Sequence, residues 1–304
     1  MRLRYFDGDN FGDALNPMIF NNVLPSFFDE DDETDFFGIG SIIGFDMMKH
    51  AKNKIIFSSG YSPAYARKYG PVAIDDSYKF YCVRGPLTAK ALKLDANLAV
   101  TDGAALLREF HFPTQAKRYK VSYMPHWTSE YIYSWADICA ECGIHYVSPR
   151  TPINAVIDQI LQSEMVIAEA MHFAIVADAL RIPWIPVKTY QFIDDFKWSD
   201  WTQSLQMDYH ARKLPSLQRY DEAFEHKLRK KTRNMLPQQV IGLSKRLMDR
   251  YQQLFVRKKS IAALSALVQE EPTMSKDEIF NAKTDQLLDI LSDIKRTYQP
   301  TQRN

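Results

Sequence analysis

The chain has 304 residues, of which 46% are apolar and 13% aromatic, so it can bury a core of ordinary size. This composition excludes a disordered protein, and no stretch reaches the roughly 20 apolar residues of a membrane-spanning helix. Three cysteines form no even disulfide framework, and the first residues lack the apolar core of a signal peptide, so we expect a cytoplasmic location.

The net charge of +1 conceals two segments of opposite charge. Residues 1–40 hold nine acidic and two basic side chains, whereas residues 225–260 hold eleven basic and two acidic ones. In the basic segment the charges alternate with apolar side chains such as Leu243, Leu247 and Leu254. A solvated helix face is the simpler interpretation, but this pattern also suits an anionic membrane surface. No nucleic-acid-binding motif is present, so we expect no nucleic-acid partner.

Short apolar segments alternate with helical segments along the first part of the chain. We expect strands at 2–6, 36–43, 54–57, 80–83 and 97–101, a helix beginning near Asn16 and Pro17, and another after Pro86. The acidic run at 29–35 is expected to be a solvated loop. Parallel strands need crossover connections, so this alternation predicts an α/β domain of Rossmann-like type at 1–110.

A second series of the same kind follows a connection at 108–118. Strands are expected at 120–124, 144–147, 165–168 and 184–187, with helices at 129–141 and 152–162 and another after residue 171. This predicts a second Rossmann-like domain at 119–205 that faces the first across a cleft. Residues 220–298 are expected to form a helical extension, with basic amphipathic helices at 222–259 and a last helix at 276–297.

The segment 163–186 is the strongest candidate for a functional site. It has the pattern of strand, turn, helix and strand, and His172 falls where the helix begins. Ligands of open α/β sheets bind at the carboxyl ends of the strands, and a helix amino terminus favours an anion. We therefore expect His172 to act in the site as a proton donor, the alternative being a core histidine bonded to a backbone carbonyl.

Other polar residues follow expected strands. Arg84 is placed to bind a carboxylate or phosphate, although a surface arginine would be equally ordinary there. Asn10 and Asp13 either cap the next helix or bind sugar hydroxyls. His126 either faces the cleft or is a structural turn residue. Glycine-rich turns at 38–41 and 59–60 allow a ligand close to the backbone, but GxGxxG and GxxxxGK[ST] are absent, and we expect neither a metal nor a cofactor.

Several short motifs occur together in one order along residues 1–200. They are AsnPheGlyAsp at 10–13, PheGlyIleGlySer at 37–41, SerGlyTyr at 59–61, ValArgGlyPro at 83–86, ThrAspGly at 101–103, MetProHis at 124–126 and the segment 163–186. This pattern resembles the polysaccharide pyruvyl transferase family, in particular its exopolysaccharide (succinoglycan-type) branch, which has a similar Pro-His turn. Where that family commonly has Arg-Leu-His, this chain has Ala170, Met171 and His172.

The resemblance implies transfer of pyruvate from phosphoenolpyruvate onto two hydroxyls of one sugar, giving a cyclic ketal, in a fold similar to the two-domain GT-B glycosyltransferases. Arg84 would neutralise the donor and His172 would be the general acid, with Asp13, Glu169 and His126 as alternative bases. The donor site implied comprises Arg84, Met171, His172, Ser59 and Gly60, and the acceptor site Asn10, Asp13, His126 and Glu169. The acceptor implied is a lipid-linked oligosaccharide or polysaccharide at the inner membrane face.

Two other functions fit the same sequence. A nucleotide-sugar glycosyltransferase would share the GT-B architecture but would bind a nucleotide sugar in place of phosphoenolpyruvate. A non-catalytic membrane-associated scaffold would keep the basic helices without binding any donor.

Overall fold

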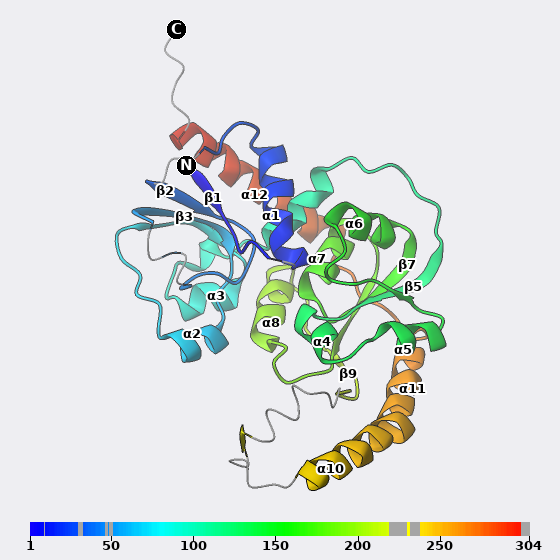
Figure 1. Cartoon of the computed structure of the whole chain (residues 1–304). Helices are drawn as coiled ribbons and strands as arrows, with labels where there is room; N and C mark the ends of the chain where they lie inside the picture. Colours follow the sequence, from blue (N-terminus) through cyan, green and yellow to red (C-terminus); the bar gives the residue numbers. More distant parts are fainter. Residues whose placement is uncertain are drawn as a thin grey trace.

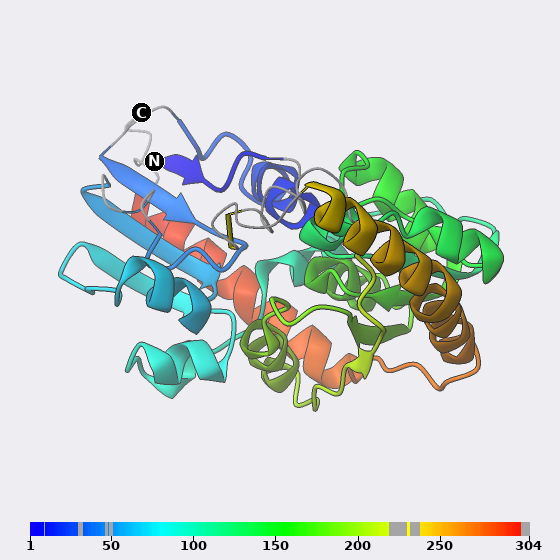
Figure 2. The ribbon, with the colours of Figure 1, turned by 60° about the horizontal axis from the view of Figure 1, so that its bottom comes forward.

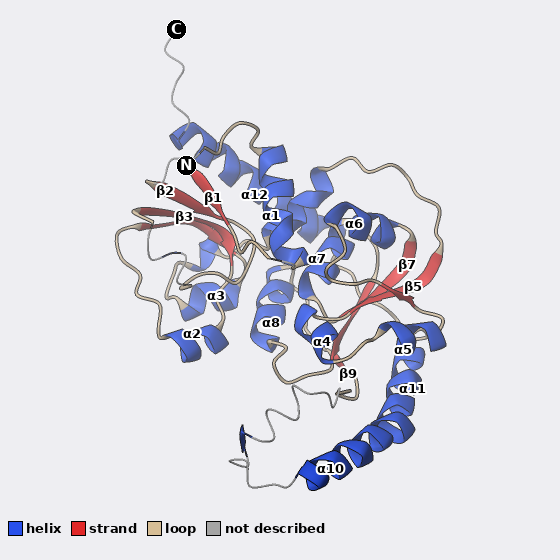
Figure 3. Ribbon diagram, viewed as in Figure 1, coloured by secondary structure: helices blue, strands red, loops and turns tan. Residues whose placement is uncertain are grey.

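The computed structural model describes residues 1–8, 10–29, 33–45, 48, 51–218, 230–231 and 238–298. These residues form two parallel β-sheets with helices around them, as Figures 1 and 3 show. The α/β class expected from the sequence is therefore confirmed. The GT-B-like arrangement of two domains facing across a cleft stays a prediction.

The first sheet has the strand order β1-β2-β3-β4, all parallel. Its strands are β1 (Arg2–Arg4), β2 (Thr34–Phe37), β3 (Asn53–Ser59) and β4 (Tyr78–Val83). The helices of this half are α1 (Phe11–Val23), α2 (Pro63–Tyr69) and α3 (Pro86–Ala91), with 3-10 turns η2 (Ala96–Leu98) and η3 (Gly103–Glu109). Residues 97–101 were expected to be a strand, which is wrong, because only a single bridge joins Ala99 to Val83.

The acidic run at 29–35 is not entirely a solvated loop. Asp35 lies in β2 and is fully buried, and its two carboxylate oxygens each accept from an arginine Nε at 3.0 Å, one from Arg2 and one from Arg4. These pairs explain why an acidic residue tolerates burial here, since a buried charge needs a partner. Residues 30–32 of the run lie outside the described residues.

Helix α1 begins at Phe11 with Asn10 as its cap, five residues before the start expected at Asn16 and Pro17. Pro17 therefore lies inside the helix, where its missing N–H leaves the carbonyl of Asp13 without a helical partner. The side-chain amide of Asn16 replaces that partner by donating to Asp13 O at 3.0 Å. It also bonds both backbone groups of Ile39, so one buried side chain both repairs the helix and fixes the loop after β2.

The second sheet has the order β6-β5-β7-β8-β9, again parallel. Its strands are β5 (Tyr119–Met124), β6 (His145–Tyr146), β7 (Ser163–Ala168), β8 (Trp184–Lys188) and β9 (Arg212–Lys213), with helices α4 (Trp127–Ile132), α5 (Ala136–Glu141), α6 (Ile153–Leu161), α7 (Met171–Ala179) and α8 (Asp195–Ser204). The one helix expected at 129–141 is two, because the chain extends at Tyr133 and buries Trp135 against Tyr123.

The C-terminal part does not form one unit. Helix α10 (Gln238–Tyr251), the π-helical η4 (Gln252–Val256) and α11 (Arg257–Leu267) form a rod that projects from the sheets (Figure 1). Its α11 end is attached by Leu264 and Leu267, which share a core with Trp135, and by an ion pair between Arg257 and Glu141. Helix α12 (Asp277–Tyr298) crosses back to the first sheet (Figures 1 and 2). Four of its apolar residues join the same core as Phe36 and Val166 from the two sheets. The domain limits 1–110, 119–205 and 220–298 stay a prediction.

Within the described residues, no helix is both long and apolar enough to span a bilayer.

We predict that Asn16→Ala destabilises the fold by roughly 2–4 kcal/mol, because it leaves buried backbone groups of Asp13 and Ile39 without partners. Chemical denaturation of the variant and the unmodified chain measures this loss. Asn21→Ala is the matched control, because Asn21 is an exposed asparagine of the same helix. Equal stability of the two variants would contradict the role given to Asn16.

Candidate functional site

A pocket of about 780 Å³ is lined from both halves of the chain. The first half contributes Phe6, residues 10–13, residues 40–42, Phe45, Tyr65 and Lys68, and the second half contributes residues 126–128, Tyr131, Pro149, residues 169–172, residues 192–194, Lys197 and Trp198. The pocket therefore gathers the segment 163–186, the Pro-His turn and the AsnPheGlyAsp loop, which are far apart in sequence.

His172 lies in the first turn of α7 with its ring pressed against α1. A Cβ atom added to Gly12 would lie 2.0 Å from His172 Nδ1, so only glycine leaves room for the ring. The other nitrogen, Nε2, is buried and lies 3.7 Å from Asp102 Oδ2, and neither atom has a hydrogen-bond partner among the described residues. Because Nε2 is enclosed, Nδ1 is the nitrogen left to meet a ligand.

Asp102 is fully buried behind His172. Its Oδ1 caps η3 by accepting from Ala104 N at 3.0 Å, which directs Oδ2 toward the imidazole. Burial opposes ionisation, but the nearby imidazole of His172 and the charge of Arg84 outweigh it, so the pKa of Asp102 lies below its ordinary value. Asp102 is therefore a fixed negative charge beside His172, an arrangement that orients a catalytic imidazole.

Asn10 and Asp13 lie to either side of Gly12 in the chain, where the His172 ring packs, and both line the pocket. Asn10 caps α1, its Oδ1 accepting from Gly12 N, and its Nδ2 donates to Asp13 Oδ2. Burial raises the pKa of Asp13, whereas the charge of His172 and the hydrogen bond from Asn10 lower it. The effect of burial is the larger, so the pKa of Asp13 lies above its ordinary value. Both readings of these residues therefore have a basis: Asn10 is a cap, and both side chains also line the pocket. A carboxylate with a raised pKa accepts a proton more readily near neutral pH.

Lys197 is a pocket residue that sequence analysis missed. It lies in the first turn of α8, its Nζ donating to Tyr65 Oη at 3.2 Å and lying 4.4 Å from the centre of the Tyr65 ring. Burial and the charge of Arg84 lower the pKa of Lys197 to about 8. The sequence signal that could have found Lys197 was Asp194, a typical helix cap shortly after a buried strand. A helix that begins there has its first turn at the same sheet edge as His172.

Glu169 and His126 line the pocket but also hold its frame. The two carboxylate oxygens of Glu169 accept from the backbone N–H groups of His126 and Thr189, each at 2.9 Å, and burial raises the pKa of Glu169. His126 Nδ1 accepts from Thr128 N and caps α4. Burial and the charge of Lys197 lower the pKa of His126 to about 3, so the ring is neutral and carries its proton on Nε2.

Arg84 is fully buried and does not line the pocket. Its Nε donates to Asp200 Oδ2 at 3.1 Å and its Nη1 to Ser41 Oγ at 2.7 Å. Ser41 does line the pocket, so Arg84 lies directly behind the wall. Gly60 makes this possible, because a Cβ atom there would lie 2.2 Å from the guanidinium carbon. The direct contact of Arg84 with a donor stays a prediction.

Ser59 and Gly60, which were also expected to bind the phosphoenolpyruvate donor, lie behind the pocket wall near Arg84. The hydroxyl of Ser59 donates to the carbonyls of Phe37 and Gly38, and the N–H of Gly60 donates to Gly40 O. Neither residue lines the pocket, whereas Met171 does. The structure thus brings together Asn10, Asp13, His126, Glu169, Met171 and His172, and sets Ser59, Gly60 and Arg84 behind them.

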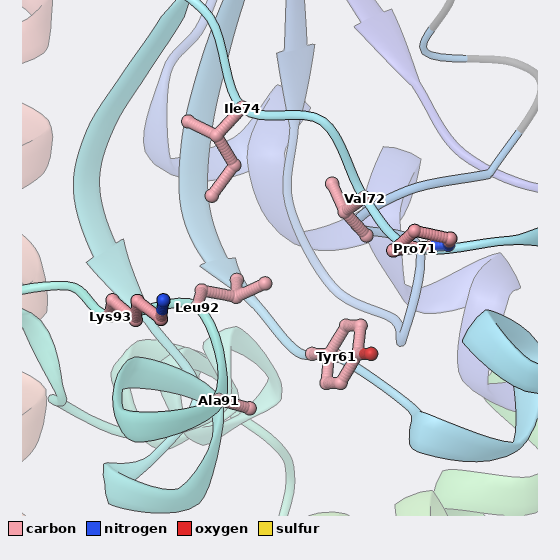
Figure 4. Close-up of a pocket in the computed structure, with 7 residues that line it drawn as sticks. All are labelled: Tyr61, Pro71, Val72, Ile74, Ala91, Leu92 and Lys93. Atoms are coloured by element: carbon pink, nitrogen blue, oxygen red, sulfur yellow. The ribbon is translucent and has the colours of Figure 1, made fainter.

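A second, smaller pocket of about 310 Å³ lies between the 71–74 loop and the end of α3, as Figure 4 shows. Its lining is largely apolar, with Tyr61 and Lys93 as its titratable residues. In the part of the chain that the structure describes, no three His, Cys, Asp or Glu side chains are grouped as metal ligands would be. The larger pocket, which gathers His172, Asp13 and Lys197, is therefore the candidate site.

Comparisons with known proteins agree with the motifs. The chain is 36% identical over 210 residues to "Succinoglycan biosynthesis protein ExoV" of Rhizobium meliloti (strain 1021). The match covers 68% of this chain and 65% of that protein's length, just under two thirds. No family model matches the chain, and no solved structure matches it. This similarity to a protein of succinoglycan biosynthesis supports the resemblance of the motifs to the polysaccharide pyruvyl transferase family, in its exopolysaccharide branch.

Proposed function

We propose that this chain transfers pyruvate from phosphoenolpyruvate onto two hydroxyls of one sugar in an exopolysaccharide or capsule repeat unit, forming a cyclic ketal and releasing phosphate. The observation that carries the proposal is the meeting of His172, Asp13 and Lys197 in one pocket, with the buried carboxylate of Asp102 behind His172. Such a pocket offers an acid, a base and a cation to a small anionic substrate. Similarity to a protein of succinoglycan biosynthesis supports the sugar acceptor.

The reaction needs a proton at one carbon of the donor and two attacks at another. The C3 methylene of phosphoenolpyruvate takes a proton and becomes the methyl group, which makes C2 electron-poor, and one sugar hydroxyl forms a bond to C2. Phosphate then leaves with the electrons of its C2–O bond, and the second hydroxyl closes the ketal. The proton of one sugar hydroxyl makes up for the proton that the general acid gave to C3, and the proton of the other hydroxyl leaves with the phosphate.

His172 is the proposed general acid. Its Nε2 faces Asp102, so Nδ1 is the nitrogen that delivers a proton to C3. The ionised Asp102 holds the ring in one orientation and stabilises the imidazolium form, as a carboxylate does behind other catalytic histidines. The packing of the ring against Gly12 adds a second restraint, which keeps the reacting nitrogen in place.

Lys197 is the proposed cation that meets the donor's phosphate or carboxylate. It lines the pocket, whereas the guanidinium of Arg84 lies behind Ser41 and is paired with Asp200. We propose that Arg84 acts as a positioning residue, by holding the Ser41 hydroxyl and adding positive potential. Met171 supplies an apolar surface beside His172.

Asp13 is the proposed base that accepts the hydroxyl protons. Among the three candidates from the sequence, Glu169 has both oxygens engaged by backbone N–H groups, and His126 has its acceptor nitrogen engaged by Thr128. Asp13 lines the pocket together with His172 and has a raised pKa. We assign to Glu169 and His126 the shaping of the acceptor side, with Asn10 as a hydroxyl ligand.

We predict that His172→Ala lowers kcat by at least roughly 100-fold, because the general acid is lost. The assay incubates the chain with phosphoenolpyruvate and the depyruvylated exopolysaccharide of its source cells, then measures released phosphate and, by mass spectrometry, the pyruvate ketal on the glycan. His111→Ala is the control, because His111 is exposed and outside the pocket. Turnover of a nucleotide sugar in place of phosphoenolpyruvate would favour a glycosyltransferase, and full activity of His172→Ala would overturn the assignment.

We predict that phosphoenolpyruvate binds more weakly as the pH rises through about 8, because Lys197 loses its charge there. Lysine is protonated below its pKa, so the affinity is retained on the acid side and lost on the alkaline side; a bound dianion would move the midpoint upward. Isothermal titration from pH 7 to 9.5 measures this loss. Lys197→Arg should keep its affinity at high pH and Lys197→Met should be weak throughout. The same pH profile in Lys197→Arg would exclude Lys197 as its cause.

We also propose that the chain works in the cytoplasm and that the rod of α10, η4 and α11 binds the anionic inner surface of the cell membrane. Val240, Leu243, Leu247 and Tyr251 recur at helical spacing and are exposed, whereas Ile241, on another side of the helix, is buried. Residues 238–259 hold six basic side chains and one acidic one. Pairing with a second copy would bring like charges together, so the charge favours anionic lipid.

We predict that Leu243→Ser with Leu247→Ser lowers binding to vesicles of phosphatidylglycerol and phosphatidylcholine by at least about tenfold, because two exposed leucines no longer enter the bilayer surface. Co-sedimentation measures binding, with vesicles of phosphatidylcholine alone as the uncharged reference. Ile74→Ser is the control, being an exposed apolar residue elsewhere. Undiminished sedimentation of the double variant would refute the membrane proposal, and a change in oligomeric state would indicate a second copy. Truncation near residue 220 is unsuitable, because it removes α12 from the core.

A further inference from the structure

Exposed aromatic side chains gather at the mouth of the candidate site. Six aromatic residues in the described part of the chain are strongly exposed, and four of them line the large pocket: Phe6, Trp127, Tyr131 and Phe192, with 42–56% of each residue accessible. We call these four residues the aromatic rim. The other two, Tyr251 and Phe255, lie on the projecting rod. Exposed large rings grouped at a pocket indicate a binding surface, whereas rings scattered singly do not.

The rings on the second half of the chain follow one another around the pocket. The Phe192 ring centre lies 5.8 Å from that of His126, which lies 5.8 Å from that of Trp127. Trp127 in turn packs edge to face against Tyr131 at 6.0 Å. Phe6 contributes a ring from the first half, after β1. On the second half, Phe192, Trp127 and Tyr131 thus form with His126 a continuous aromatic surface at the pocket wall.

Neighbouring contacts hold the rim in place before any ligand arrives. The guanidinium of Arg150 lies 4.3 Å from the centre of the Tyr131 ring and is ion-paired with Glu130. Phe192 stacks on Tyr190 at 5.2 Å with nearly parallel rings. Because the rings are restrained, a ligand that stacks on them gives up little side-chain freedom of the protein.

We propose that the aromatic rim binds the acceptor as an oligosaccharide of several sugars, whose terminal or reacting sugar enters the pocket while the following sugars stack on the rings. Sugar rings present faces of C–H groups with slight positive charge, and aromatic faces carry negative charge, so the two surfaces attract each other. The inference rests on the proposed function for the identity of the acceptor. It adds that a single sugar is a poor acceptor, because only a chain reaches the rim.

The chemistry of the rim favours a carbohydrate over a nucleotide or a lipid headgroup. The cation beside Tyr131, Arg150, is already neutralised by Glu130, so this part of the surface suits an uncharged ligand. Behind the rim lie Asn10, Asp13 and the neutral His126, whose amide, carboxylate and ring N–H suit hydroxyl groups. The aromatic surface and the polar floor together match the apolar faces and polar edges of a sugar chain.

The test measures binding alone, so it is independent of pyruvyl transfer. Depyruvylated oligosaccharides of one to eight sugars, prepared from the exopolysaccharide of the source cells, are titrated against the intact chain by calorimetry. We expect affinity to rise with length over the first few sugars. Trp127→Ala and Phe192→Ala should each weaken the longer oligosaccharides by roughly 3- to 10-fold and leave the single sugar unchanged. Trp127→Phe should restore most of the loss, because it keeps a ring.

Phe255→Ala is the matched control, since Phe255 is equally exposed but lies on the rod. Affinity that does not depend on length, or losses in the rim variants no greater than in Phe255→Ala, would overturn the proposal. If the protein binds long oligosaccharides but neither binds nor consumes phosphoenolpyruvate, the proposal for the aromatic rim stands and the proposed pyruvyl transfer is refuted. If the protein turns over phosphoenolpyruvate equally well with single sugars, the proposed pyruvyl transfer stands and the proposal for the aromatic rim is refuted.

Discussion

The close approach of α7 to the first half of the chain is the constraint on which the site depends. His172 begins α7 in the second half, but its ring packs against Gly12 of α1, and its Nε2 lies beside Asp102 at the start of η3. Any side chain at position 12 would separate these elements, because its first carbon would overlap the imidazole. The contact that joins the two halves is therefore also the contact that orients the ring of His172, the proposed acid. A shared hydrophobic core, including α12, holds both partners in register.

A second link between the halves is a buried charge network. Asp200 of α8 accepts from Arg84 after β4 and from the backbone and hydroxyl of Thr88 in α3. A buried ion pair adds little net stability over apolar packing, but loss of one partner is costly because the other charge is left unpaired. The network fixes α8 against the first half and so places Lys197, three residues before Asp200, at the pocket. Gly85 and Gly60 leave the space in which it forms.

The sequence predicted most strands and the location of the site, because local signals determine them. The segment 163–186 folds as expected, and its histidine lies at a sheet edge beside the AsnPheGlyAsp loop. What could not be predicted depends on partners distant in the chain. Arg84 is at a strand end as expected, but Asp200, 116 positions later, draws it behind the wall. The start of α1 differs from the prediction because the Asn16 side chain, which is held by Ile39, replaces the hydrogen bond to Asp13 O that Pro17 cannot make. Lys197 has no motif of its own.

Burial and neighbouring charges shift the pKa values of the ionisable groups at the pocket in different directions. Burial raises the pKa of Asp13 and lowers that of Lys197 to about 8, so both groups exchange protons closer to neutral pH than they would in water. Asp102 is more deeply buried than either, but His172 and Arg84 keep its pKa low and its charge fixed. The proposed base Asp13 and the proposed donor-binding cation Lys197 are thus both shifted toward neutrality. The group that only orients another is the one held ionised. An anionic donor entering beside Lys197 would favour its protonated form, so substrate binding itself would complete the positive charge that the reaction needs.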